Sequence, residues 1–120
     1  MTKEFSFEKL TVWQDAKSLT MVIYKLSKAF PKEEIYGISS QIKRSANSVN
    51  SNIAEGSARA SKKDQARFYT MAFSSLIETL NHIIIASELD YVTQEEYNNL
   101  RKKITAIAYK LNALKKSITN

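Results

Sequence analysis

Two acid–base pairs are the residues of this sequence best placed to do chemistry. In SNIAEGSAR, residues 51–59, Glu55 precedes Arg59 by four positions, and further along the chain Glu78 precedes His82 by the same spacing. Residues four apart on a helix share a face, so each pair could join a proton acceptor to a neighbouring charge. One carboxylate and one imidazole are too few ligands to hold a metal well, and His82 is the only histidine. We therefore expect no metal site and no catalytic site at either pair.

Other signatures of catalysis are missing from the sequence. Without cysteine the chain has no thiolate nucleophile, no disulfide and no zinc–thiolate site. It has no G-x-x-x-x-G-K-[ST] or G-x-G-x-x-G loop, and its serines stand in no G-x-S-x-G turn. The sequence thus predicts a protein that is not an enzyme and takes no cofactor and no small-molecule substrate.

The first pair is one end of a longer polar band. On a helical wheel the band lies beside an apolar arc and comprises Gln41, Ser45, Ser48, Asn52, Glu55 and Arg59. One hypothesis makes Asn52, Glu55 and Arg59 a recognition site for a ligand. The other, which we favour, is a structural polar network that holds helices or subunits in register, formed by Gln41, Asn52, Glu55 and Arg59. Gly56, on the apolar arc, supports the network because a missing side chain lets a neighbouring helix come close.

Long helices must position these residues. Two glycines and one proline in 120 residues leave few points at which a helix would be interrupted. Apolar residues that recur every three or four positions predict helices at 11–30, 35–58, 62–89 and 94–118. Three of them follow a capping signal: Thr11-Val12-Trp13-Gln14, Ser61-Lys62-Lys63-Asp64 and Thr93-Gln94-Glu95-Glu96. With short loops, these elements predict an all-α fold, a single antiparallel up-down-up-down four-helix bundle over residues 1–120.

The third predicted helix is apolar over more of its circumference than one core-facing side requires. Beyond its main stripe it carries further apolar side chains, among them Phe73, Ile77, Ile84 and Ile85. Either this helix is central and touches all the others, or it forms a subunit interface, and the pattern does not separate these alternatives. Because so much exposed apolar surface would favour aggregation, we expect an oligomer.

The charge of the chain is unevenly distributed. The formal net charge is +6, and the basic segments 41–67 and 101–120 flank the segment 68–100, which has five acids and no Lys or Arg. Such clustering suits an anionic partner, although Lys-rich helix faces also serve solubility alone. The N-terminal MTKEFSFEKL lacks the apolar core of a secretion signal, and no run approaches the roughly 18 apolar residues of a membrane span. We expect a cytoplasmic protein without a membrane partner.

Several motifs together resemble a known family. They are Trp13-Gln14-Asp15-Ala16, Phe30-Pro31, Glu34, Tyr36-Gly37, Gln41-Ile42-Lys43-Arg44-Ser45, Ser48, Asn52-Ile53-Ala54-Glu55-Gly56 and Arg59. From about residue 7 to about residue 114 the chain resembles the bacterial four-helix-bundle proteins first noticed as open reading frames in 23S rRNA intervening sequences. It departs from many members at Asn50, where they have proline, and at Ser74, where they have glycine.

The resemblance implies an antiparallel four-helix bundle that assembles into a homopentamer. A related family, the accessory variability determinant of diversity-generating retroelements, forms a basic pentameric barrel that binds nucleic acid and a reverse transcriptase. The resemblance leaves the molecular role of this chain open, because the ribosomal label of the family reflects gene location.

From charge and resemblance we expect a non-enzymatic, oligomeric nucleic-acid-binding protein that acts on RNA. The expected phosphate-contacting residues are Lys43, Arg44, Arg59, Lys62, Lys63, Arg67, Arg101, Lys102, Lys103 and Lys110, with Lys115 and Lys116 beyond them. No aromatic-rich RNA-binding motif accompanies them, so base-specific contacts are not expected. The alternative is a protein-interaction scaffold that docks a nucleic-acid enzyme or an acidic protein partner.

Overall fold

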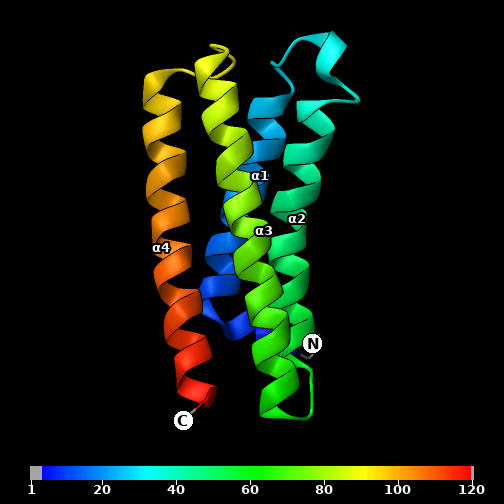
Figure 1. The fold of residues 1–120 in the computed structure, drawn as a ribbon, viewed down its shortest axis with the longest axis vertical. Coiled ribbons are helices and arrows are strands. Elements are labelled where there is room, and N and C mark those ends of the chain that lie inside the picture. Colours follow the sequence, from blue (N-terminus) through cyan, green and yellow to red (C-terminus); the bar gives the residue numbers. More distant parts are fainter. Residues whose placement is uncertain (1–3, 120) are drawn as a thin grey trace.

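The apolar spacing of the sequence produces four long helices. The computed structural model describes residues 4–119, which form α1 (Thr11–Ser27), α2 (Ile38–Ser57), α3 (Lys62–Glu88) and α4 (Gln94–Thr119), with 3₁₀ turns η1 (Ser6–Lys9) and η2 (Lys32–Glu34). The helices run antiparallel around a ring in which α1 packs on α2 and α4, and α3 packs on the same two neighbours (Figure 1). The predicted up-down-up-down bundle is confirmed, and no described helix is long and apolar enough to cross a membrane.

One hydrophobic core runs along the axis of the bundle. Each helix contributes the residues that its stripe predicted, such as Leu19 from α1, Ile53 from α2, Leu76 from α3 and Ile107 from α4, all fully buried. At about 25 cal/mol per Å² of apolar surface removed from water, this shared core is the main source of stability. Tertiary packing, more than the propensity of each segment, therefore keeps the helices formed.

Two of the three predicted caps are confirmed. The Ser61 hydroxyl accepts the Asp64 amide at 3.1 Å, and Thr93 and Glu96 bond reciprocally at 3.1 and 2.8 Å. The cap predicted at Thr11 is wrong, because Leu10 occupies the N-cap position. The side-chain amide of Gln14 donates to the Glu8 carbonyl instead.

Some predicted helix ends also differ from the structure. The first helix stops at Ser27, not at residue 30, because the Ala29 and Phe30 amides bond carbonyls only three residues back. The second helix begins at Ile38, not at residue 35, because residues 32–34 form the turn η2.

The neighbouring helices α2 and α3 approach each other closely. A Cβ placed on Gly56 would lie 2.7 Å from Tyr69 Cε1 and 2.9 Å from Phe68 Cβ. Real Cβ atoms are essentially never that close to another atom. The expectation that Gly56 permits close packing is confirmed.

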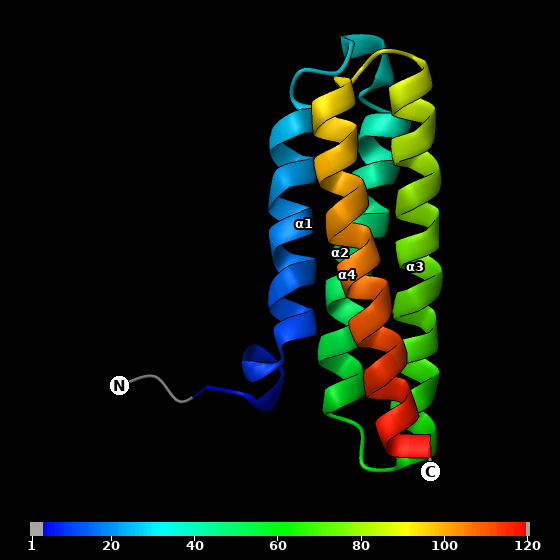
Figure 2. The same ribbon diagram turned by 90° about the vertical axis from the view of Figure 1, so that its left-hand side faces the viewer.

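The outer face of α3 exposes apolar side chains. Ile77 is 49% exposed and Ile84 is 38% exposed, while Phe73 packs partly on the core. The alternative that this helix touches all the others is wrong, because α1 lies diagonally across the bundle from it (Figure 2). The surplus apolar surface of α3 is thus surface, not core.

A candidate nucleic-acid interface at one end of the bundle

Basic side chains gather where α2 turns into α3. The α2 helix ends at Ser57, and the amides of Ala58 and Arg59 then bond the carbonyls of Glu55 and Gly56 in a tight last turn. Ser61 caps α3, so Lys62 and Lys63 stand exposed in its first turn and Arg67 in its second. We call Arg59, Lys62, Lys63 and Arg67 the basic end. The last turns of α4, with Lys115 and Lys116, lie at the same end of the molecule (Figures 1 and 2).

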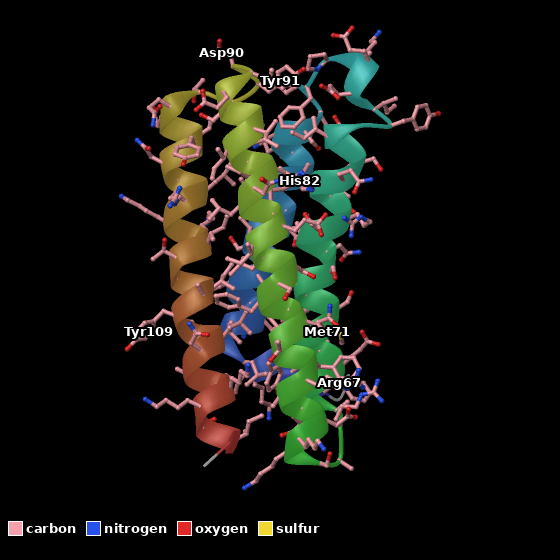
Figure 3. All side chains as sticks on the ribbon, in the orientation of Figure 1. Arg67, Met71, His82, Asp90, Tyr91 and Tyr109 are labelled. Carbon is pink, nitrogen blue, oxygen red and sulfur yellow. The ribbon has the colours of Figure 1, made fainter. Side chains whose placement is uncertain are left out.

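Both arginines of the basic end lie over one aromatic ring. The guanidinium carbons of Arg59 and Arg67 are 4.3 and 4.7 Å from the centroid of Phe68, within the range of a cation–π contact. Asp64 forms an ion pair with each arginine, with a nitrogen–oxygen distance of 2.8 Å for Arg67 and 3.8 Å for Arg59. The contacts fix the two planar cations while their outer edges stay in solvent, and Figure 3 shows Arg67 pointing away from the bundle.

The basic end keeps a positive balance. Its own acids among the described residues are Asp64, which the two arginines share, and Glu55, exposed near the end of α2. A shallow hollow of about 510 Å³ opens beside Lys63 and Arg67. Four cations against two carboxylates, beside an open hollow, can accept backbone phosphates without burying a charge.

The other predicted basic residues of α2 lie elsewhere. Arg44 donates to the Gln41 side chain at 3.0 and 3.2 Å and pairs with Glu78 of α3. The ammonium of Lys43 lies 5.6 Å from the centroid of the Tyr24 ring. Arg44 lies more than three turns before the end of α2, so the structure does not bring it to the basic end.

The α4 residues form a second basic face against α1. Lys110 pairs with Asp15 at 2.6 Å, Lys103 approaches Ser18 at 3.3 Å, and Arg101 donates to the Tyr97 hydroxyl. An open hollow on this face is lined by Arg101, Lys102, Thr105, Ala106, Tyr109 and Lys110.

Sequence reasoning missed the aromatic residue of that face. Tyr109 is 77% exposed and points away from the bundle (Figure 3). The signal was present, because Tyr109 follows Lys102 by seven residues, two turns along the same side of the helix.

The predicted polar network is continuous only in part. The Thr79 hydroxyl donates to the Ser45 hydroxyl at 2.8 Å, and both residues are fully buried. The hydroxyls of Ser48 and Ser75 are bonded at 2.9 Å, and the Asn52 amide donates to Ser48. The Ser45 and Ser48 bonds join α2 to α3, whereas the Asn52 bond lies within α2, so the band crosses to α3 at its serines and not at the four residues of the predicted network. Gln41 is exposed, and among residues 4–119 its side chain hydrogen-bonds only Arg44.

The expected ion pair at the end of the band is wrong. No ion pair joins Glu55 to Arg59 among residues 4–119, because α2 ends between them and Arg59 turns to Asp64. A buried contact between α1 and α2 was not predicted: the Thr20 hydroxyl lies 2.5 Å from the side-chain amide of Asn50.

The second acid–base pair forms, but as part of a structural cluster. His82 Nε2 lies 3.1 Å from Glu78 Oε2, and the same carboxylate holds Arg44. Within the described residues no group of three His, Cys, Asp or Glu side chains is arranged to hold a metal. The cluster ties α2 to α3 on the outer surface of the bundle.

Comparisons with known proteins agree with this architecture. A family model described as 23S rRNA-intervening sequence protein matches residues 8–113. A solved structure, a protein of unknown function from the S23 ribosomal protein family of Bacteroides thetaiotaomicron VPI-5482, is similar with a TM-score of 0.81 and 24% identity. The similarity covers 88% of this chain and 98% of that chain, and at this identity it shows the fold alone. No curated protein matches the chain.

Proposed function

The chain belongs to the family of 23S rRNA-intervening sequence proteins, and on that premise we propose that it is a non-enzymatic oligomer that binds RNA through the basic end. The observation that carries the proposal is the gathering of Arg59, Lys62, Lys63 and Arg67 around one turn, with two guanidiniums held over Phe68. Planar guanidiniums fixed in advance lose little conformational freedom when they contact a phosphate.

The contacts would be made to the phosphate backbone. Lys62 and Lys63 are exposed, and no described residue forms an ion pair or hydrogen bond with either side chain. Phosphate contacts release condensed counterions, so affinity should fall steeply as salt rises. We expect no stacking of RNA bases on Phe68, because this ring is buried beneath the arginines.

Oligomerisation would multiply these contacts. The exposed isoleucines of α3 support a subunit interface on the outer face of that helix, and the family resemblance suggests five copies. A ring would present the basic end five times, so weak single contacts would add through multivalency. A light-scattering mass of the purified chain tests the count directly.

A binding experiment with matched charge reversals tests the function. We expect fluorescence anisotropy with a generic single-stranded RNA to show binding at low salt and a steep loss on adding salt. Lys62→Glu/Lys63→Glu should weaken binding about tenfold and flatten the salt slope by about two. Lys28→Glu/Lys32→Glu makes the same change in net charge at the opposite end and should leave the slope close to that of the parent chain.

Two results would decide against the proposal. If the oligomer retains neither RNA nor DNA at low salt, nucleic-acid binding is wrong, and the exposed α3 face favours the second candidate, a scaffold that docks a protein partner. If both double variants weaken binding equally, only net charge matters and the basic end is not the site.

A further inference from the structure

A cavity of about 230 Å³ lies at the end of the bundle opposite the basic end. It forms where the last turn of α1, the connection through η2 and the first turns of α2 meet. These segments lie at the top of the bundle in Figure 1. The walls of the cavity combine two kinds of side chain. The apolar wall includes Tyr24, Phe30 and Ile35, and the polar wall includes Lys28, Lys32 and Lys43.

Ser39 lines this cavity with an unused hydroxyl. The residue is only 5% exposed, yet its side chain forms no hydrogen bond with any residue from 4 to 119. Every described side-chain nitrogen or oxygen that is sealed from solvent has a hydrogen-bond partner. The Ser39 oxygen has none, so it is not sealed, and it faces the cavity that Ser39 lines. Ser27, on the same wall, differs because it donates to the Tyr24 carbonyl at 3.1 Å. A nearly buried hydroxyl without a protein partner can donate to a ligand atom that enters the cavity.

The charge around Ser39 is positive. Neither Lys28 nor Lys32 forms an ion pair with a described residue, and Lys43 is held over the Tyr24 ring. Among the described residues that line the cavity none is an acid. The nearby Glu34 is engaged outside it, where its carboxylate accepts the Tyr91 hydroxyl at 2.8 Å and faces the Ile38 amide at 3.4 Å.

The backbone adds to this preference for an anion. Ser39 is the second residue of α2, in the turn whose amides have no carbonyl partner within the helix. The carbonyls of Leu26 and Ser27, at the end of α1, are already bonded by the Ala29 and Phe30 amides. Two of the carbonyls at the end of α1 are thus occupied, while the start of α2 offers backbone donors to an anion beside Ser39.

We propose that this cavity binds a small phosphomonoester that carries an aromatic or apolar group. The phosphate would lie against the lysines and accept the Ser39 hydroxyl, and lysines are common point-charge partners of phosphate. The organic group would cover the wall of Tyr24, Phe30 and Ile35. The volume is below that of usual drug-sized pockets, so a compact ester fits and an extended ligand does not. The site is independent of the RNA-binding proposal.

Calorimetry with the full chain tests the site, with phenyl phosphate as the probe. We expect saturable binding of phenyl phosphate, about tenfold weaker binding of inorganic phosphate, and none of the neutral benzyl alcohol. Ser39→Ala should weaken the binding of phenyl phosphate about tenfold, and Lys28→Gln/Lys32→Gln should weaken it by a similar factor. The matched control Lys9→Gln/Lys17→Gln, at exposed positions outside the cavity lining, should leave the affinity for phenyl phosphate unchanged. Thermal unfolding of Ser39→Ala should match the parent, since the lost hydroxyl has no protein partner.

Specific outcomes would overturn the proposal. Absence of saturable binding, or equal affinity in the parent and both cavity variants, removes the site. Inorganic phosphate binding as tightly as phenyl phosphate removes the role of the apolar wall. A further comparison uses AMP and a 5′-phosphorylated oligoribonucleotide. If the oligonucleotide binds more than tenfold tighter than AMP and Ser39→Ala abolishes the difference, the site holds a chain end, and the small-ester assignment is wrong.

Discussion

Replacing Gly56 with alanine tests whether the close approach of α2 and α3 shapes the basic end. Two effects compete. Alanine is favoured over glycine within a helix by about 1 kcal/mol. Against this gain, the added Cβ would lie 2.7 Å from Tyr69 Cε1 and 2.9 Å from Phe68 Cβ. The first atom belongs to a ring that is 4% exposed and the second is close to its backbone, so neither yields easily.

The overpacking should exceed the gain in helix propensity. Inserting a methyl group into a packed interior costs about 1–3 kcal/mol. Subtracting about 1 kcal/mol of propensity leaves a loss of up to about 2 kcal/mol in the free energy of unfolding. For a chain of this size that corresponds to a fall in Tm of several degrees, at about 4 °C for each kcal/mol.

The assay is urea unfolding at one fixed protein concentration, because an oligomer gains stability with concentration. Ser51→Ala, at an exposed position of the same helix, is the matched control and should change stability by less than about 0.5 kcal/mol. Since Phe68 supports both arginines, Gly56→Ala should also weaken RNA binding while the control does not. A Gly56→Ala chain more stable than the parent by about 1 kcal/mol would refute the close approach, because propensity alone would then decide.

Three further predictions concern the rest of the bundle. Thr20→Val should lower the free energy of unfolding by about 1–3 kcal/mol in urea melts, because the Asn50 amide loses its buried partner; an unchanged midpoint would argue against that contact. The hydrogen bond to Glu34, with burial, raises the pKa of Tyr91, so the folded state holds the phenol proton to higher pH than the unfolded state. This stabilisation is complete below about pH 10 and is lost as the pH rises through the raised value, so Tyr91→Phe and the parent should converge in Tm only in strong alkali. Ile77→Glu, at a half-exposed position on α3, should lower the light-scattering mass of the oligomer with little change in helix content by circular dichroism, whereas an unchanged mass would exclude this face as an interface.

The fold was predictable because its signals are local. The spacing of Leu19, Ile53, Leu76 and Ile107 places each on the core side of its helix without knowledge of its neighbours. Caps at Ser61 and Thr93 also depend on residues three positions away. The end of α2 was predicted to within one residue, at 58 against Ser57, whereas its start and the end of α1 were each placed three residues away from those in the structure. The Glu55–Arg59 pair does not form because Arg59 lies beyond the end of α2 and pairs with Asp64.

The candidate site was less predictable because its contacts join distant segments. Lys110 forms an ion pair with Asp15, which lies 95 positions earlier in the sequence. Lys110 is therefore not an unpaired cation. Arg44 is paired in the same way by Glu78 of another helix. The number of basic residues is visible in the sequence, but the course of the helices decides that Arg44 and Lys110 pair with acids of other helices while Arg59 and Arg67 share Asp64 within the basic end.

The antiparallel course also separates the two proposed ligands. The α2–α3 turn and the last turns of α4 lie at one end, while the α1–α2 connection and the α3–α4 turn, with Asp90 and Tyr91, lie at the other (Figures 1 and 3). In a cyclic ring every subunit points the same way along the axis, because rotation about one axis preserves direction. In a ring whose bundles lie along the ring axis, all copies of the basic end would share one rim, and all copies of the Ser39 cavity the other. RNA along the first rim would leave the cavities open, so any effect of a phosphomonoester on RNA affinity would have to pass through the helices or the subunit contacts and not through competition for one surface.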